Sequence, residues 1–395
     1  MFRIQVALLC LIPVALANLR LVALVFRHGD RSPTGTYPTD PHKDFPWPNG
    51  FGQLTQLGMV QQYELGTHLR KRYTTENSET YLFDGSYSRN EVYVRSTDVD
   101  RTLMSAECQM AAFYHPNGSQ VFLKNLKWQP VPIHTVPKDE DNVLHAFTAD
   151  CPVYKQFENN LINDPDWVQK RKENQWLLDY LKNKTGVTHE MDLHEAGHIG
   201  GILFAQQQHN LSLPSWLSQQ QYETLLNISV FRKMKRFEGL TAHRLTAGIL
   251  VNDIVTNMQN KKEQGNNPNE QKLFIYSAHD DTLVALLSAL NLFDGENPPY
   301  ASVVMIELYS ELGQYTVKIY YHKGPKADSV VAPPLLPLPG CDSSCPLNTF
   351  GRLLTSVLIN ETEWKKECQL TSSSQPVSIT IALFWLFQLL RLLLL

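Results

Sequence analysis

The sequence has no surplus of basic residues. Its 35 lysine and arginine residues are outnumbered by 39 aspartate and glutamate residues, for a formal net charge of −4 over 395 residues. A domain that binds nucleic acid usually carries a clearly basic surface, so we expect no nucleic-acid partner. The sequence also lacks solenoid-type repeats, long low-complexity runs and the P-loop pattern G-x-x-x-x-G-K-[ST]. Its 43% hydrophobic and 19% charged residues are ordinary for a globular chain of one or two domains.

Both ends of the chain resemble targeting segments. Residues 1–17 combine Arg3 with a short apolar run and an Ala-x-Ala ending, which is typical of a secretory signal peptide cleaved after Ala17. The alternative, a membrane-anchoring first helix, is disfavoured because the run is too short to span a bilayer. Residues 376–395 are almost wholly apolar and follow a cluster of small residues. We therefore expect residues 371–395 to be a C-terminal hydrophobic anchor segment, either a GPI signal or a transmembrane span.

Entry into the secretory pathway places the folded part in a lumen, for example the lysosome, or outside the cell, and predicts glycosylation. A single N-x-S/T sequon can occur by chance, but five in one chain favour a lumenal or extracellular protein. They begin at Asn117, Asn183, Asn210, Asn227 and Asn360.

Cysteine is scarce, and Cys10 leaves with the signal peptide. Cys341 and Cys345 are close enough in "CDSSC" to close a small ring, and in that case Cys151 and Cys368 are a possible long-range pair. Cys108 lies in a helix-like stretch, and we expect it to be a buried free thiol. The cysteine spacings match no zinc-ligand pattern.

Strands and helices alternate near both ends of the chain, which indicates an α/β fold with a largely parallel sheet. The stretch "LRLVALVF" is a continuous apolar run, as expected for a strand buried on both faces. Thr55 is a suitable N-cap for a helix over 55–73. The character changes between 140 and 238, where polar-faced helical segments predominate. We expect a discontinuous α/β domain (18–139 and 239–370) with an inserted α-helical cap (140–238). The other expected elements are strands at 91–96, at 272–278 and in a hairpin near Gly313, and helices at 97–114, 239–258 and 280–292.

Three polar clusters fall at the ends of predicted strands. They are Arg27-His28-Gly29-Asp30-Arg31, then Arg95, and finally His279-Asp280. Ligands in open α/β sheets bind beyond the carboxyl ends of the strands, so we expect these side chains to meet at one edge.

This combination of side chains suits phosphate. Arginine presents a planar fork of donors that matches phosphate oxygens, and Arg27, Arg31 and Arg95, with His279, form the expected binding set. Flanking guanidinium groups favour the neutral imidazole, which makes His28 the candidate nucleophile. Gly29 is expected to let the backbone approach the ligand. Asp280 is the candidate proton donor, and the hydrolysis of a phosphohistidine intermediate needs no cofactor and no metal.

The stretch "HEAGH" (194–198) is a competing motif, because H-E-x-x-H binds zinc in metallopeptidases. Gly197, Gly200 and Gly201 are expected to weaken the regular helix that such a site requires. A zinc peptidase is therefore the less favoured alternative. His68, His115, His134, His145 and His322 lie in no comparable setting, and we interpret them as structural or exposed.

The sequence resembles the histidine acid phosphatase branch (clade 2) of the histidine phosphatase superfamily, and within it the prostatic and lysosomal acid phosphatases. The most specific matching stretches are "LVFRHGDRSP" and "YVRSTDVDRTLMSA"; others are "YPTDPHK", "GQLTQLGM", "WQPVPIHTVP", "LPSW", "YSAHDDTL" and "PPYAS". They cover the chain from about residue 20 to beyond residue 300.

The resemblance implies a phosphoglycerate-mutase-like sandwich, its central mostly parallel sheet flanked by helices and capped by an α-helical insertion. It implies hydrolysis of phosphate monoesters at acid pH, with His28 as nucleophile and Asp280 as proton donor. It also implies a homodimer and supports the pairs Cys151–Cys368 and Cys341–Cys345. Phosphotyrosine, nucleotides and lysophospholipids all stay open as substrates.

Two departures and three further alternatives accompany this resemblance. Relatives carry another disulfide between about 200 and 310, where this chain has no cysteine. The sequence "HDD" places Asp281 beside Asp280, and an inward-pointing Asp281 is expected to raise the pKa of Asp280. Secretion disfavours a mutase. A phytase is disfavoured because it needs a more basic pocket than the overall net charge of −4 suggests. A non-catalytic, membrane-anchored recognition protein is a further alternative, which the intact His28 and Asp280 disfavour.

Overall fold

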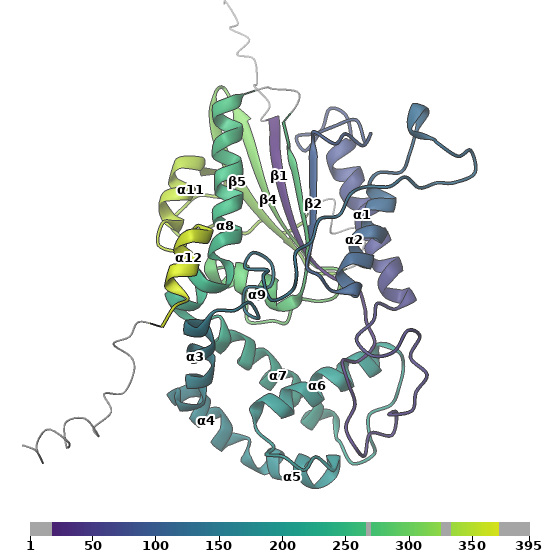
Figure 1. Ribbon diagram of the computed structural model, residues 1–395, viewed down its shortest axis with the longest axis vertical. Helices are drawn as coiled ribbons and strands as arrows, with labels where there is room; N and C mark the ends of the chain where they lie inside the picture. The colour runs from purple at the N-terminus through teal and green to yellow at the C-terminus, as the bar shows by residue number, and fades with distance from the viewer. Residues whose placement is uncertain (1–17, 266–269, 325–332, 371–395) are drawn as a thin grey trace, which may run out of the picture.

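The computed structural model describes residues 18–265, 270–324 and 333–370. The expected signal peptide (1–17) and anchor segment (371–395) lie outside these residues. A six-stranded sheet with the order β2-β3-β1-β4-β5-β6 forms the centre, and helices cover both of its faces (Figure 1). The predicted α/β fold is therefore confirmed. Within the described residues, we find no helix both long and apolar enough to cross a membrane.

The elements of the α/β layer come from both ends of the chain. The strands are β1 (Asn18–Arg27), β2 (Val92–Ser96), β3 (Leu273–Ala278), β4 (Val303–Glu311), β5 (Gln314–His322) and β6 (Cys345–Pro346). The helices are α1 (Gln56–Thr74), α2 (Asp100–Phe113), α8 (Gly239–Gln264), α9 (Asp280–Ala289), α11 (Leu347–Leu354) and α12 (Glu361–Glu367), with a short 3-10 helix, η1 (Gly118–Gln120).

Strand β1 is the central strand because its apolar run feeds two cores. Val22, Leu24 and Phe26 pack toward α1 and α2, whereas the alternate residues pack toward α8 and α9. The strand pairs in parallel with β3 and antiparallel with β4. Thr55 caps α1 as predicted, since its side chain accepts a hydrogen bond from the backbone N–H of Gly58.

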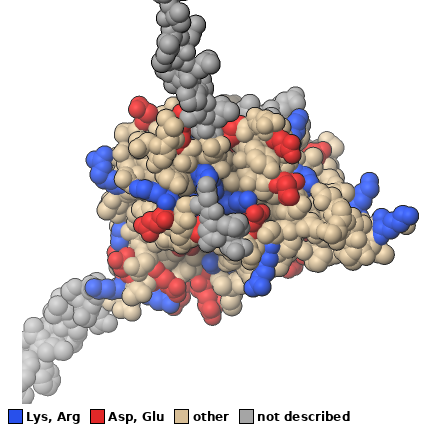
Figure 2. Space-filling view, turned by 90° about the horizontal axis from the view of Figure 1, so that it is seen from above, with Lys and Arg blue, Asp and Glu red and all other residues tan. Residues whose placement is uncertain are grey.

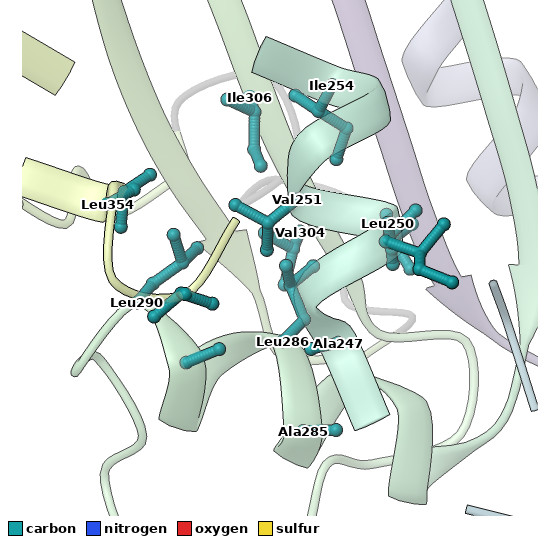
Figure 3. Packing of buried hydrophobic residues seen from close by; sticks show 14 of the residues in the cluster. Ala247, Leu250, Val251, Ile254, Ala285, Leu286, Leu290, Val304, Ile306 and Leu354 are labelled. Carbon is teal, nitrogen blue, oxygen red and sulfur yellow. The ribbon is translucent and has the colours of Figure 1, made fainter. Parts of the chain in front are cut away.

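The larger core lies between the sheet and α8 and α9. Val251 and Ile254 of α8 lie beside Val304 and Ile306 of β4, and Leu286 of α9 completes the contact (Figure 3). Burial of these aliphatic side chains fixes α9 against the sheet. Because α9 begins at the residue after His279, this packing also sets the position of the second histidine cluster.

The sheet is mixed. Strands β1, β2 and β3 are parallel, and β4, β5 and β6 extend the sheet by antiparallel pairing. The hairpin predicted near Gly313 is confirmed, because β4 and β5 are joined there by Leu312 and Gly313. Both residues have positive φ (47° and 79°), as a type I′ hairpin turn requires.

A helical layer lies beyond the carboxyl ends of the parallel strands (Figure 1). It consists of α3 (Pro152–Asn160), α4 (Pro165–Glu173), α5 (Gln175–Thr185), α6 (Leu193–Gln208) and α7 (Gln219–Arg236), with the short η2 (Leu161–Asn163). Its own apolar core includes Leu177, Leu203 and Leu225. Val143 and Leu144 instead pack in the sheet-side core, so the helices of this layer begin at α3 rather than at residue 140.

The loop 32–50 also belongs to the helical layer, which sequence patterns did not indicate. Tyr37 is buried in the helical core. The side-chain amide of Gln206, on α6, donates a hydrogen bond of 2.8 Å to Asp40. His209, at the end of α6, lies 2.7 Å from the buried carboxylate of Asp30. The loop thus connects the segment after β1 to the helices that cover it.

The opposite end of the molecule, where the parallel strands begin, has a mixed surface. Figure 2 shows acidic and basic side chains interspersed over this face. The mixture agrees with the balanced overall charge.

Candidate active site

The carboxyl ends of β1 and β3 bring the two histidine clusters together. Arg27 and Ala278 are partners in the parallel register, so His28 and His279 follow at adjacent positions. The backbone N–H of His28 donates to the carbonyl of Ala278 at 3.0 Å, which continues the ladder by one residue. The centroids of the two imidazole rings are 5.6 Å apart.

His28 is buried and held in one tautomer. Its Nδ1 lies 2.7 Å from the carbonyl oxygen of Gly29, which can only accept, so Nδ1 carries the proton and Nε2 keeps its lone pair. Burial, followed by the charges of Arg101 and Arg27, holds the pKa of His28 well below its ordinary value. The side chain therefore stays neutral and nucleophilic in mildly acidic solution.

Gly29 lies in close contact with the start of α1. A Cβ at this position would lie 2.3 Å from the carbonyl oxygen of Gly58, in the first turn of α1. A Cβ on Gly58 would in turn lie 2.2 Å from the carbonyl oxygen of Asp30. The two glycines are thus required for the loop after β1 to lie on the start of α1.

Three guanidinium groups surround His28. Arg27 is buried, stacks over the ring of Tyr300 at 4.2 Å and donates to the carbonyl of Pro298. Arg31 and Arg101 form no ion pair with any other described residue. Burial and the neighbouring Arg31 lower the pKa of Arg101 to about 10, so it still carries its charge at neutral pH. The cluster is a concentrated positive site with unused donors, which suits a phosphate dianion.

Arg95 does not join this cluster. Its NH2 group donates to Asp141 Oδ1 at 2.7 Å, and it lines a separate pocket with Asp253 of α8. The reason is the alternation of β2, which directs Val94 toward α1 and α2 and Arg95 toward α8. Arg101, in the first turn of α2, takes the place that the sequence analysis gave to Arg95. Its position in the first turn of the helix that follows β2 was the signal from which it could have been predicted.

His279 is oriented by a chain of hydroxyl groups. Its Nε2 lies 3.0 Å from Thr97 Oγ1, which lies 2.7 Å from Thr102 Oγ1. Its Nδ1 accepts from Arg101 at 3.4 Å. His145, interpreted above as structural or exposed, packs against His279 with ring centroids 4.8 Å apart and is buried. His145 therefore helps to hold the ring of His279 in position.

Asp280 is held by two cations. Its Oδ2 lies 3.1 Å from Arg27 NH2 and 2.6 Å from Lys233 Nζ, a residue of α7 that sequence reasoning missed. Burial alone would raise the pKa of this carboxyl group, but Arg27 and Lys233 outweigh it and hold the pKa of Asp280 well below its ordinary value.

Asp281 does not have the expected effect on Asp280. Its Oδ2 pairs with Arg236 NH1 at 3.0 Å, so its negative charge is largely neutralised. The pKa of Asp280 is lowered overall, so the expected rise does not appear. Lys233 and Arg236 lie near the end of α7, and their two positive charges face the two adjacent carboxylates.

The "HEAGH" stretch forms a regular helix despite its glycines, contrary to the expectation. It lies within α6, where Gly200 packs closely against Leu225 of α7. His194 Nδ1, however, accepts from the guanidinium group of Arg232 at 2.8 Å. A lone pair engaged by a cation is unsuitable for a metal ion. In the described ranges, no group of three or more potential metal-ligating side chains occurs.

Both expected disulfides are present. Cys151–Cys368 connects the start of α3 to the end of α12, and Cys341–Cys345 closes a small ring. Cys108 is free, as expected, but only partly buried. All five sequon asparagines are exposed: Asn117, Asn183, Asn210, Asn227 and Asn360.

Comparison with known proteins identifies the class that this fold and site define. Residues 18–322 match the Histidine phosphatase superfamily (branch 2), and the chain belongs to this family. Lysosomal acid phosphatase of Homo sapiens is 42% identical over 375 residues, which are 94% of this chain and 85% of that protein. Prostatic acid phosphatase of Homo sapiens is 40% identical over 362 residues, which are 91% of this chain and 90% of that protein.

A solved structure supports the fold independently. The phytase from Citrobacter braakii superposes with a TM-score of 0.65 at 17% sequence identity, covering 90% of this chain and all of that one. At this identity the similarity concerns the fold alone. This protein and that phytase thus share the arrangement that the resemblance implied, a phosphoglycerate-mutase-like sandwich with a helical cap beyond the sheet.

Proposed function

We propose that this protein is an acid phosphatase that hydrolyses phosphate monoesters through a phosphohistidine at His28. The observation that carries the proposal is a buried, uncharged imidazole surrounded by Arg27, Arg31 and Arg101. The guanidinium groups would bind the three peripheral phosphate oxygens, with His279 as a further ligand. Family membership and the two acid phosphatases at about 40% identity support the same activity.

The reaction has two steps. His28 Nε2 forms a bond to phosphorus while the bond from phosphorus to the ester oxygen breaks, and the departing alcohol takes a proton from Asp280. Water then attacks the phosphohistidine, gives its proton to Asp280 and releases inorganic phosphate and neutral His28. Asp280 is ionised in the free protein, so it must gain a proton before the first step. Acid solution favours that protonation, and so does a bound dianion that draws Arg27 toward itself.

The direct test is a substrate panel at acid and neutral pH with a chelator present. We expect turnover of simple aryl and alkyl phosphates at acid pH, unchanged by EDTA, because no step uses a metal ion. Peptidase activity that EDTA abolishes would instead support the H-E-x-x-H alternative. Absence of all turnover from a folded protein would support a non-catalytic recognition role.

We further propose that the protein forms a homodimer through an arm at residues 115–128. This blue-green loop projects from the body beside α1 and α2 (Figure 1). Its apolar side chains are unusually exposed, with Phe122 at 61% and Leu123 at 58%. Exposed apolar groups of this kind commonly mark a contact between subunits. Phe122→Glu is expected to convert a dimer into a monomer in sedimentation velocity, and a wild-type monomer would refute the proposal.

We propose a location in the secretory pathway, with the lysosome as one possible destination, on the basis of the N-terminal sequence and the named relatives. Segment 371–395 is proposed to anchor the chain on the basis of its composition. Release from membranes by phosphatidylinositol-specific phospholipase C would identify a GPI anchor. Resistance to that enzyme and to alkaline carbonate would identify a membrane span, and extraction by carbonate would refute anchoring.

A further inference from the structure

Lys233 is placed where the departing part of a substrate must lie. It lies in the last turn of α7, and α7 contacts α9, the helix that follows β3. Its Nζ is 2.6 Å from Asp280 Oδ2 and also 2.6 Å from Asn297 Oδ1, and the side chain is 16% exposed. Asp280 must reach the ester oxygen to protonate it, so Lys233 lies within a few ångströms of the atoms bonded to that oxygen.

The phosphate group itself does not require this lysine. Arg27, Arg31 and Arg101 already supply more guanidinium donors than a phosphate dianion has peripheral oxygens. Lys233 contacts the same Asp280 oxygen as Arg27, Oδ2, and its Nζ also lies 3.7 Å from Asp281 Oδ1. It reaches Asp280 from the helical layer, whereas Arg27 is the last residue of β1, so Lys233 is the cation placed to meet the part of the substrate beyond the phosphate. The preceding residue, Arg232, is half-buried, donates to His194 Nδ1 and adds a second positive charge to this end of α7.

The contact between Lys233 and Asp280 also opposes catalysis. A lysine ammonium group that donates to the carboxylate stabilises its ionised form, yet the reaction needs the protonated form. A negatively charged group on the substrate would compete with Asp280 for Lys233. Once Lys233 bonds to that group, Asp280 has one cation fewer and takes up a proton from solvent more readily.

From this geometry we infer that Lys233 is a specificity-determining residue, which binds a second anionic group, a carboxylate or a phosphate, next to the ester carbon of the leaving alcohol. The inference rests on the proposed phosphatase function and adds the substrate class to it. Esters with such a neighbouring anion are expected to be better substrates than neutral analogues of the same shape.

A matched pair of substrates tests the inference. In 2-phosphoglycerate a carboxylate replaces one hydroxymethyl group of glycerol 2-phosphate, and the phosphate ester is otherwise the same. We expect wild-type kcat/KM to be higher for 2-phosphoglycerate. In Lys233→Met, which keeps the chain length but removes the charge, the ratio of the two kcat/KM values should fall about 10- to 100-fold, the usual effect of one hydrogen bond to a charged group.

Two further variants serve as controls. Lys233→Arg retains the charge and should retain most of the preference. Lys172→Met removes one charge from an exposed site on α4 and should leave the ratio unchanged. Equal wild-type kcat/KM values for the two esters overturn the inference without any variant. A ratio within twofold of wild type in folded Lys233→Met overturns it as well. Failure of the wild type to hydrolyse either ester would overturn the proposed function, and this inference with it.

Discussion

The exchange of roles between Arg95 and Arg101 gives the most discriminating prediction. Arg95 lies in β2 and Arg101 in the first turn of the helix that follows it. Each can be replaced by methionine, which keeps most of the side-chain volume and removes the charge. The structure places Arg101 beside His28 and His279, whereas Arg95 pairs with Asp141. The two substitutions should therefore affect different properties.

Arg101→Met should lower kcat/KM by about 100- to 1,000-fold, the usual effect of losing one preorganised donor to a developing anion. The affinity for inorganic phosphate, measured as an inhibition constant, should weaken as well. The free energy of unfolding should change little or rise, because Arg101 is a partly buried cation with like-charged neighbours.

Arg95→Met should leave kcat/KM near the wild-type value and destabilise the fold. Asp141 is fully buried, and it would keep only its bonds from the N–H groups of Val143 and Leu144. Loss of the charged partner is expected to cost about 1–3 kcal/mol in the free energy of unfolding, measured with urea. The reasoning is refuted if Arg95→Met reduces kcat/KM as strongly as Arg101→Met does.

Three further predictions concern other groups. Asp280→Asn should lower kcat/KM for glycerol 2-phosphate by about 10²- to 10⁴-fold but affect 4-nitrophenyl phosphate far less, since nitrophenolate leaves without a proton; equal losses would contradict the acid role. Burial, with the charge of Lys138 next, lowers the pKa of His145 to about 4, below its unfolded value, so the folded state binds fewer protons and loses stability as pH falls from 7 to 5. His145→Gln should reduce that loss by about 2 kcal/mol in urea titrations at both pH values, and an unchanged pH dependence would contradict the assignment. Glu307→Gln removes a fully buried partner of Arg72 and should cost about 3–5 kcal/mol of unfolding free energy with kcat/KM retained; a loss of activity at full stability would contradict this structural role.

Sequence periodicity was sufficient for the main features of the fold. The unbroken apolar run of β1 predicted a strand buried on both faces, and its alternate residues do enter two separate cores. The hairpin at Gly313 and the N-cap at Thr55 followed from local conformational preferences that depend on few neighbours. Clusters at the ends of neighbouring parallel strands were correctly expected to meet, because the register of β1 and β3 leaves His28 and His279 adjacent.

The parts of the site that sequence reasoning missed depend on long-range placement. A single strand of five residues does not reveal which face a polar residue near its end will take, and the choice for Arg95 depended on α8 and Asp141. Lys233 is 47 positions from Asp280 in the sequence, in a helix whose polar face looked like ordinary solvated surface. Loop 32–50 gave no periodic signal, and its contacts with α6 exist only in the folded chain.

Trapping of the covalent intermediate tests the central claim most directly. Wild-type protein would be mixed with 4-nitrophenyl phosphate labelled in the phosphoryl group, quenched in alkali within the first turnovers and mapped by peptide mass spectrometry. The account predicts label on His28 that survives alkali, is lost in acid and is absent from His28→Ala. Label that survives acid, or that lies on a serine or an aspartate, would contradict the account.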